Sequence, residues 1–209
     1  MKSKTSPHII WTVSLMTVIL FSMSSFMFKI SWDLQKDENG VQIYTRSIEG
    51  WDINEYKATT KVKTTLNKAV EAYRYGANRA KWMSKRATGI KNLKEITKDK
   101  IYTYTYADAP WPISDRDQIS LVEYSYPKEG VVLATLTCSP DYIPRKSGVI
   151  RVARMKCHWL FEDLKNGYVR VTTQAVADPG GSLPTWLINA NIISGPHETL
   201  SGLKRYLEK

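Results

Sequence analysis

The sequence is poor in cysteine and histidine. Its 209 residues contain two cysteines, Cys138 and Cys157, and three histidines. Two cysteines exclude the disulfide framework of a small secreted scaffold, and three histidines leave little room for a zinc cluster. We expect the two cysteines to lie on successive strands but several residues out of register, too far apart to bond. The sequence therefore predicts two free thiols.

Motifs of the common enzyme classes are also missing. The chain has no G-x-S-x-G nucleophile elbow, no P-loop and no G-x-G-x-x-G nucleotide fingerprint. No paired acid–base set is visible. His158 and His197 have no nucleophile close to them in sequence, so we interpret them as packing residues. These absences argue against an enzyme.

Positive charge is in excess and is unevenly distributed. Thirty Lys and Arg residues against twenty Asp and Glu residues give a net charge of +10. The stretch from Lys57 to Lys100 holds 13 basic and three acidic residues, so it carries the whole excess. A basic residue near an anionic leaflet contributes about 1 kcal/mol to binding. We predict that this stretch docks on an anionic membrane surface, with a merely solvated face as the alternative. No recognised nucleic-acid motif appears, so a nucleic-acid partner is not expected.

The N-terminus has the pattern of a targeting segment. A basic start is followed by an apolar run from Ile9 to Phe21 and then by small residues. This order is typical of a cleaved signal peptide. Counted to Phe28, the apolar stretch has about 20 residues and can also span a bilayer as an uncleaved anchor. In both cases residues 1–30 precede the folded domain, which we predict over 31–209. The protein is then exported (periplasmic or extracellular) or membrane-anchored.

The remaining chain has the pattern of one α+β domain. Hydrophobic residues make up 43% of the sequence, which is too many for a disordered chain. The patterns predict strands over 41–48, 56–62, 101–106, 117–124, 131–137, 149–161 and 168–176, with helices over 65–75, 80–83 and 184–207. Consecutive strands favour a curved antiparallel sheet of about seven strands laid against the long C-terminal helix. Such a sheet cannot press its whole inner face onto one helix, so we expect a cavity between them.

One segment brings two charged side chains to the start of a strand. In Ala109–Asp117, prolines on both sides of Trp111 fix an extended entry, and Arg116 and Asp117 follow. The charged residues either pin a turn through an ion pair or contact a ligand head group.

Two further segments stand out. Gly148–Val152 places Arg151 within an apolar strand, where it either caps the cavity or pairs with an acid. Asp178–Asn189 is a turn that leads into the terminal helix. In that helix Gly195 and Pro196 predict an interruption, which is either a hinge for a lid or a static bend.

In this order and spacing, the three segments resemble the START family, the steroidogenic-acute-regulatory-protein-related lipid transfer domains. The likeness covers residues 32–207 and is greatest to the phosphatidylcholine-transfer branch. It implies a helix-grip fold around a hydrophobic tunnel, one bound lipid and no cofactor. Gln118 and Val122 replace an aromatic residue and an arginine that are frequent in the family. The ligand therefore stays open between a phospholipid, a sterol and a fatty acid.

The motifs and the resemblance together define a predicted lipid site. Its members are Tyr104, Trp111, Arg116, Asp117, Arg151, Trp186, Leu187 and Asn189. Arg116, Asp117 and Arg151 are expected near the polar end of the tunnel. Tyr104 belongs to an alternating tyrosine stripe that either packs across strands or meets a head group. Trp186 and Leu187 are expected to take opposite roles, one toward the tunnel and one toward solvent or membrane.

The predicted function is that of a monomer that carries or senses a lipid at a membrane surface. The alternative is a small-molecule enzyme, similar to a cyclase, that uses the same helix-grip cavity.

Overall fold

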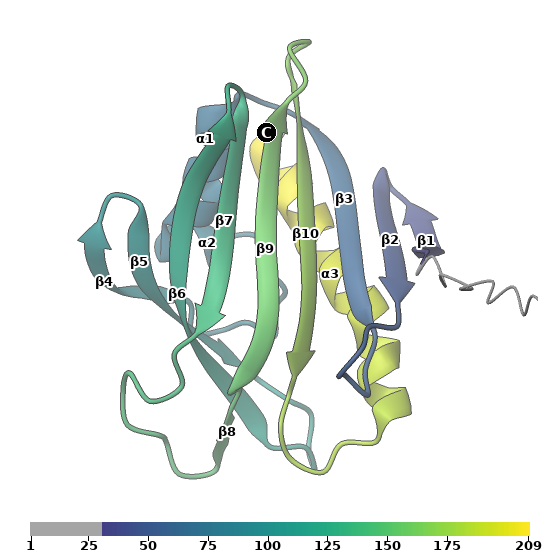
Figure 1. Cartoon of the computed structure of the whole chain (residues 1–209), viewed down its shortest axis with the longest axis vertical. Helices are drawn as coiled ribbons and strands as arrows, with labels where there is room; N and C mark the ends of the chain where they lie inside the picture. Colours follow the sequence, from purple (N-terminus) through teal and green to yellow (C-terminus); the bar gives the residue numbers. More distant parts are fainter. Residues whose placement is uncertain (1–30) are drawn as a thin grey trace, which may run out of the picture.

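The fold consists of one large sheet and three helices. The computed structural model describes residues 31–209, and the predicted targeting segment lies outside them. The elements are β1 (Asp33–Glu38), β2 (Val41–Arg46), β3 (Glu55–Lys63), α1 (Leu66–Arg74), α2 (Gly76–Arg79), β4 (Lys91–Thr97), β5 (Lys100–Ala107), β6 (Asp115–Lys128), β7 (Val131–Cys138), β8 (Val149–Arg151), β9 (Arg154–Asp163), β10 (Tyr168–Asp178) and α3 (Thr185–Leu207). The ten strands form an antiparallel sheet in the order β1-β2-β3-β10-β9-β7-β6-β5-β4, and β8 pairs in parallel with β6 (Figure 1). The predicted α+β helix-grip fold is confirmed.

The sheet is wider than the sequence pattern indicates. β1 and β4 were not predicted because they are exposed, polar edge strands that lack apolar alternation. The run predicted over 149–161 divides into β8 and β9, since the chain leaves the sheet between them. The short helix predicted over 80–83 is also displaced, because α2 ends at Arg79.

The helices cover one face of the sheet, which we call the inner face. Strand alternation and register place these side chains on it: Tyr56, Ala58, Thr60 and Val62 of β3; Val169, Val171, Thr173 and Ala175 of β10; Met155, Cys157, Trp159 and Phe161 of β9; Val132, Ala134, Leu136 and Cys138 of β7; Gln118, Ser120, Val122 and Tyr124 of β6; Ile101, Thr103 and Thr105 of β5. All of these residues are uncharged. By the same register, Arg116, Asp163 and Ala177 continue the inner face at the strand ends, and the positions that alternate with these form the outer face.

One end of the interior is closely packed. The ring of Tyr73 on α1 lies 4.6 Å from that of Trp159, and Trp82 meets Trp159 edge-on at 5.9 Å. The indole N–H of Trp82 donates to the carbonyl of Ala72 at 3.0 Å. Leu200 of α3 is fully buried in the same cluster. The C-terminal half of α3 is therefore fixed in the core.

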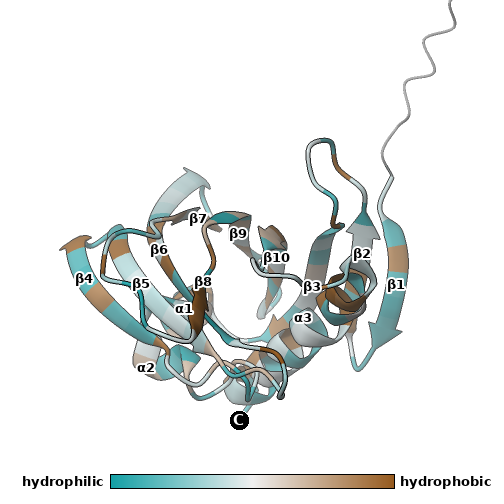
Figure 2. Ribbon diagram, turned by 90° about the horizontal axis from the view of Figure 1, so that it is seen from below, coloured by the Kyte–Doolittle hydropathy of each residue, from teal (hydrophilic) through white to brown (hydrophobic). Residues whose placement is uncertain are grey.

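The N-terminal half of α3 is covered less completely. Leu187, Ile188 and Ile193 are only half-buried, although the helix packs along β2 and β3. Seen from the end where α3 begins, the sheet curves so that α3 lies along one arm while β4 and β5 form the other (Figure 2). The helix runs through the buried Pro196 without the predicted interruption, and the hinge stays a prediction. No helix among residues 31–209 has the length and apolarity that a membrane crossing requires.

We expect Gly202 of α3 to be essential for this packing. A Cβ at Gly202 would lie 2.0 Å from the carbonyl oxygen of Trp82, whereas one at Gly195 would meet nothing within 4 Å. Gly202→Ala should lower the free energy of unfolding by about 1–3 kcal/mol. Gly195→Ala is the matched control and should raise it by up to about 1 kcal/mol, because alanine favours helix. Urea denaturation measures both, and equal effects of the two substitutions would contradict the close contact.

Candidate functional site

The inner face is open at the end where α3 begins. Its side chains there are half-buried although they point toward the interior: Tyr56, Thr105, Gln118, Leu136, Cys138, Met155 and Cys157. Because α3 contacts β2 and β3, the inner face of β5, β6, β7 and β9 is less completely covered at this end. We call this less covered part of the inner face the inner recess.

The polar groups of the inner recess are neutral. Burial raises the pKa of the Cys157 thiol to about 12 and also raises the pKa of the Tyr56 phenol. The nearby Thr173 hydroxyl partly opposes this rise in the pKa of Cys157. Both groups therefore remain protonated near neutral pH. The inner recess thus combines apolar side chains with uncharged hydrogen-bonding groups.

The two cysteines are free, but their predicted separation is wrong. Register pairs Leu136 with Cys157, so Cys138 and Cys157 are diagonal neighbours on the inner face. The error came from the long connection between β7 and β9, which contains β8 and shifts the register. Diagonal neighbours are farther apart than directly paired residues, in keeping with two free thiols.

Asp117 and Arg151 form a buried ion pair on the outer face. The Nε of Arg151 lies 2.5 Å from Oδ1 of Asp117, and its Nη2 donates to Oδ2 at 3.0 Å. The side chains are 1% and 0% exposed. Arg151 also donates to the carbonyls of Pro140, Ile143 and Pro144, so the pair holds the 139–148 loop against β6. Neither side chain lines the inner recess, which supports the ion-pair alternative and argues against direct contact with a head group.

Tyr104 supports the same ion pair. Its hydroxyl donates to Oδ2 of Asp117 at 3.3 Å, and the ammonium of Lys146 lies 5.0 Å from its ring centre. Tyr102, on the same outer face, stacks on Tyr142 of the 139–148 loop at 3.7 Å. The tyrosine stripe therefore packs against this loop and does not reach the inner recess.

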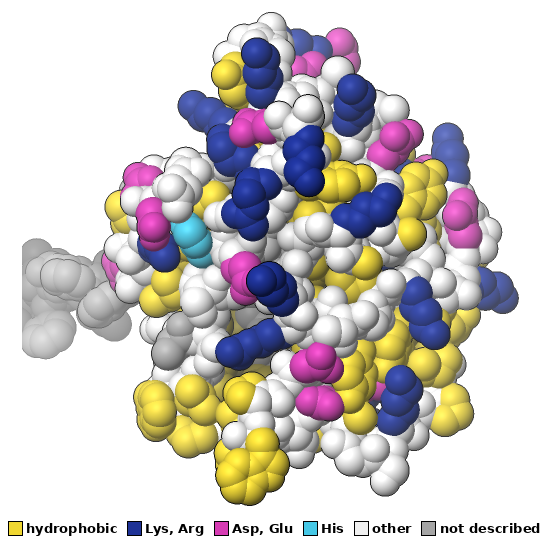
Figure 3. Space-filling view, turned by 180° about the vertical axis from the view of Figure 1, so that it is seen from behind, with side chains coloured by type: hydrophobic (Ala, Val, Ile, Leu, Met, Phe, Trp, Pro, Cys, Tyr) yellow, Lys and Arg dark blue, Asp and Glu magenta, His cyan; other side chains and the backbone are white. Residues whose placement is uncertain are grey.

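Trp111 and Trp186 lie on two neighbouring segments at the open end. Trp111 is 92% exposed in the loop before β6, and Trp186 is 71% exposed in the first turn of α3. Arg116 joins these segments, because its Nη2 donates to the carbonyl of Gly180 at 3.4 Å. Viewed from the helix side, hydrophobic side chains gather at this lower end of the molecule (Figure 3).

Leu187 and Asn189 follow Trp186 on α3. Leu187 is half-buried while Trp186 is exposed, as expected for residues with opposite roles. The side-chain oxygen of Asn189 accepts a hydrogen bond from the backbone N–H of Asn54 at 3.2 Å. Asn189 thus fastens the start of α3 to the loop between β2 and β3.

The basic stretch from Lys57 to Lys100 does not form one face. The stretch begins on β3 and ends at the start of β5. In the sheet, β3 and β4 are separated by five other strands, so the two ends of the stretch lie far apart across the sheet. Arg74 and Lys100 pair with Asp99 and Glu123. Basic side chains on the helix side are interspersed with acidic and uncharged ones (Figure 3). The stretch is therefore distributed over β3, α1, α2, β4 and β5, and membrane docking through it stays a prediction.

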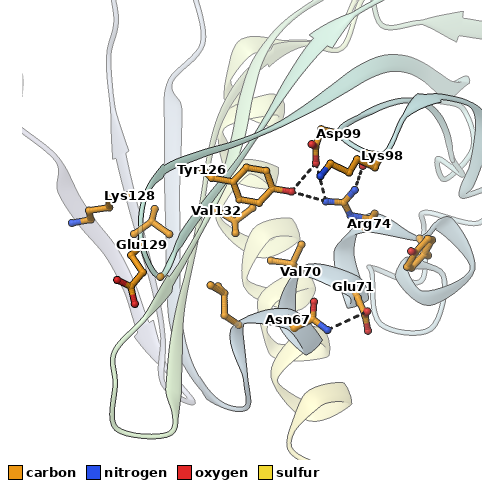
Figure 4. A pocket seen from close by; sticks show the side chains of 14 residues that line it. Asn67, Val70, Glu71, Arg74, Lys98, Asp99, Tyr126, Lys128, Glu129 and Val132 are labelled. Carbon is orange, nitrogen blue, oxygen red and sulfur yellow. Dashed lines mark hydrogen bonds and ion pairs between the residues drawn. The ribbon is translucent and has the colours of Figure 1, made fainter.

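A separate groove of about 670 Å³ lies between α1 and the β6–β7 turn (Figure 4). Its floor includes Val70 and Val132, and the Tyr126 hydroxyl donates to Asp99 at 2.6 Å. Arg74 lies 3.6 Å from the same carboxylate. The groove is at the end of the sheet opposite the start of α3, outside the inner recess (Figure 1). Among residues 31–209, no group of three or more His, Cys, Asp or Glu residues is placed to hold a metal ion.

Arg79 is a functional candidate that the sequence analysis missed. It is 3% exposed at the end of α2, and its Nη2 donates to the side-chain oxygen of Asn92 at 3.2 Å. Its Nε has no hydrogen-bond partner. In sequence it belongs to a basic stretch, and a four-residue helix gives no periodicity that would predict its burial.

Comparisons with known proteins agree with this geometry. The START domain matches residues 29–208. An uncharacterised protein of Pseudomonas aeruginosa is 32% identical over 198 residues, which cover 94% of this chain and 96% of that protein. The phosphatidylcholine transfer protein of Rattus norvegicus is 31% identical over 166 residues, which cover 76% of this chain and 75% of that protein.

Solved structures show the same architecture. A fragment of the STAR-related lipid transfer protein from Xanthomonas axonopodis superimposes with a TM-score of 0.78 at 31% identity, covering 85% of this chain and 99% of the fragment. Human StAR-related lipid transfer protein 5 has a TM-score of 0.76 at 22% identity, covering 84% of this chain and 86% of that one. At this lower identity, the similarity to the human protein establishes a shared fold only.

Removing Arg151 should destabilise the fold strongly. Arg151→Ala leaves the Asp117 carboxylate buried without its partner, and we expect the free energy of unfolding to fall by about 3–5 kcal/mol. The double variant Asp117→Asn/Arg151→Met removes both charges and should recover much of this loss. Urea denaturation measures both, and a loss below about 1 kcal/mol for Arg151→Ala would refute the role of the pair.

Asp115 should hold the Trp111 loop only while it is ionised. The Tyr106 hydroxyl donates to Asp115 at 2.5 Å and the Ala109 N–H at 2.9 Å, and these bonds lower the pKa of the carboxyl group. A lowered folded-state pKa gives stability that is present above the unfolded pKa and is lost as pH falls through the folded one. At neutral pH, Asp115→Asn should therefore speed hydrogen exchange across residues 108–114, and Asp141→Asn, in another loop, should not. The difference from wild type should shrink as pH falls through the lowered folded-state pKa of Asp115; a difference that stays constant as the solution is acidified would contradict the mechanism.

Proposed function

The chain belongs to the START domain family, and from this premise we propose that it binds one lipid in the inner recess and transfers it at a membrane surface. Membership in this lipid-transfer family supports binding and transfer of a hydrophobic ligand. The observation that carries the proposal is the inner recess itself. There, apolar and neutral side chains face inward beneath the less tightly packed half of α3 and remain half-buried.

The energetics of lipid transfer explain the need for such a recess. A two-chain lipid in water exposes on the order of 30 methylene groups, at about 0.8 kcal/mol each. The inner recess offers Leu136 and Met155 from the sheet, and the half-buried Leu187 and Ile188 belong to the part of α3 beside it. These side chains replace the bilayer interior around the lipid tails. The barrier to leaving one membrane for another is thereby lowered.

Two exposed tryptophans form the proposed membrane contact. Indole rings are enriched at membrane–water interfaces, where they meet both apolar and polar surroundings. Trp111 and Trp186 flank the open end of the inner recess, so docking through them presents the opening to the bilayer. The basic stretch from Lys57 to Lys100 would add electrostatic attraction to an anionic membrane.

The N-terminal segment would act at the same end of the molecule. Asp33 pairs with Thr45, near the loop between β2 and β3 that Asn189 fastens to α3. The polypeptide chain therefore begins the folded domain at the same end as the opening of the inner recess. We propose that the protein is exported or membrane-anchored; an anchor in residues 1–30 would hold the opening toward its own bilayer.

The alternative of a cavity enzyme has weaker support. The neutral Cys157 thiol and Tyr56 phenol are poor bases near neutral pH. Asp117 is paired with Arg151 on the outer face, away from the inner recess. His158 also lies on the outer face, and His197 contacts the backbone carbonyl of Glu38 at 3.2 Å. The inner recess therefore supplies shape and apolar contact, which suits a carrier.

Transfer between vesicles tests the proposal. We expect the protein to move a fluorescent phospholipid from donor to acceptor vesicles without chemical change, as thin-layer chromatography of the recovered lipid would show. Burying a large apolar side chain contributes about 1.5–3 kcal/mol. Trp111→Ala or Trp186→Ala should therefore slow transfer on the order of tenfold.

Tyr126→Ala is the matched control, because Tyr126 is exposed at the opposite end of the sheet. It should leave the transfer rate unchanged. Absence of transfer by wild type would refute the carrier function, and conversion of the lipid would favour the enzyme.

A further inference from the structure

A second concave site lies on the outer face, apart from the inner recess. The chain over 88–91, which leads into β4, forms one wall, and the 139–148 loop forms the other. The pocket measures about 420 Å³ and is lined by Thr88, Gly89, Ile90, Lys91, Tyr104, Tyr106 and Lys146. These lining residues include two cations and no acid. We call this site the outer pocket.

The two lysines of the outer pocket share the ring of Tyr104. The ammonium group of Lys91 lies 5.6 Å from the ring centre and that of Lys146 lies 5.0 Å from it. Neither lysine takes part in the ion pairs found among residues 31–209. Like charges held near one ring repel each other, and a ring face is a weaker partner for a cation than a counterion is. The outer pocket therefore has two positive charges that an anion would balance.

Three carboxylates contact residues of the outer pocket, and each of them has another partner. Asp117 is paired with Arg151. Asp115 accepts a hydrogen bond from the Tyr106 hydroxyl at 2.5 Å, and Asp108 accepts one from a threonine hydroxyl at 3.2 Å. These carboxylates are bound to hydroxyl or guanidinium groups and not to the two ammonium groups. The positive charge of the pocket is thus left for a ligand.

Both walls of the outer pocket are held in place by contacts described for the fold. The first wall lies directly on Tyr106, since a Cβ at Gly89 would come within 2.7 Å of the Cβ of Tyr106. The second wall is held by Arg151, which donates to the carbonyl of Pro144, two residues before Lys146. The backbone that carries the two lysines is therefore ordered before a ligand binds, and such preorganisation favours affinity.

The outer pocket borders the loop that carries Trp111. The backbone N–H of Asp108 donates to the carbonyl of Arg86 at 2.8 Å, which ties the start of this loop to the chain just before the pocket. The 139–148 loop, the other wall, lies at the end of the molecule where α3 begins (Figure 1). The proposed membrane contact through Trp111 and Trp186 therefore brings the outer pocket to the level of the lipid head groups.

A phosphate monoester matches the charge of the outer pocket. It carries about 1.5 to 2 negative charges at neutral pH and offers three oxygen acceptors. Each lysine ammonium group supplies three donors and binds phosphate as a point charge.

We infer that the outer pocket binds the phosphate monoester head group of a lipid that stays in the bilayer, with Lys91 and Lys146 as its counterions. This inference rests on the proposed contact with a membrane. The lipid in the outer pocket anchors the protein and is distinct from the lipid that the inner recess carries.

Binding to two kinds of vesicle tests the inference. The full-length protein is mixed with phosphatidylcholine vesicles that contain either phosphatidic acid or enough phosphatidylglycerol to give the same measured surface potential. Phosphatidic acid presents a phosphate monoester and phosphatidylglycerol a diester, so the head group differs while the potential is matched. Co-sedimentation measures the affinity for each. We expect the protein to bind the phosphatidic acid vesicles about tenfold more tightly.

Substitutions assign this preference to the outer pocket. Lys91→Gln/Lys146→Gln removes both charges, and the preference for phosphatidic acid should fall to about one. Lys68→Gln/Lys128→Gln is the matched control, because it removes the same charge from exposed lysines of α1 and of the end of β6. This control should keep the preference.

The outcomes distinguish this inference from the proposed function. Equal binding of the two vesicles by wild type, or the same loss of preference in both double variants, would overturn the inference and leave lipid transfer in place. Displacement from the vesicles by glycerol 3-phosphate, at the concentration of the accessible phosphatidic acid, would assign the pocket to a soluble phosphate ester and overturn the bilayer assignment. Failure of the proposed function is seen separately, as absence of transfer between vesicles of phosphatidylcholine alone.

Discussion

The structure depends on a mismatch between a wide sheet and one helix. Ten strands curve around an interior that the 23 residues of α3, about 35 Å long, cannot fill. The helix α3 packs along β2 and β3. At the end of the sheet opposite the start of α3, α1 and α2 cover the interior. What is left is the inner recess. There the inner-face side chains remain half-buried, because α3 contacts β2 and β3 and covers the other strands less completely.

Because side chains alternate along each strand, one face of the sheet holds the loops and the other faces the interior. On β6, Asp117 points to the outer face and the next residue, Gln118, to the inner one. The outer positions fasten loops through the Arg151 pair and the tyrosine stripe, while the inner positions are uncharged except for Arg116 and Asp163 at strand ends. The same strands thus hold the surrounding loops through their outer face and line the interior through their inner face. Arg79, a further buried charge, is supplied by α2 and not by a strand.

Much of the fold could be predicted from the sequence. The central strands alternate in hydrophobicity, and the motifs ending at Asp117, Val152 and Asn189 carry the family likeness. The edge strands β1 and β4 could not be predicted, because their polar residues face solvent on both sides. The site was predicted less well. A motif places Asp117 and Arg151 near each other in space but does not say which face of the sheet they occupy, and the burial of Arg79 depends on tertiary packing alone.

The close approach of Gly202 to Trp82 fixes the C-terminal end of α3 more tightly than its half-buried N-terminal end, which Asn189 holds to the loop between β2 and β3. From Gly202 to Trp186 the helix measures about 24 Å, so a tilt of about 10° around the glycine moves the tryptophan end by about 4 Å. A tilt of this size would widen the entrance while it left the contact between Gly202 and Trp82 in place. Admission of a ligand would then require little change in the aromatic core.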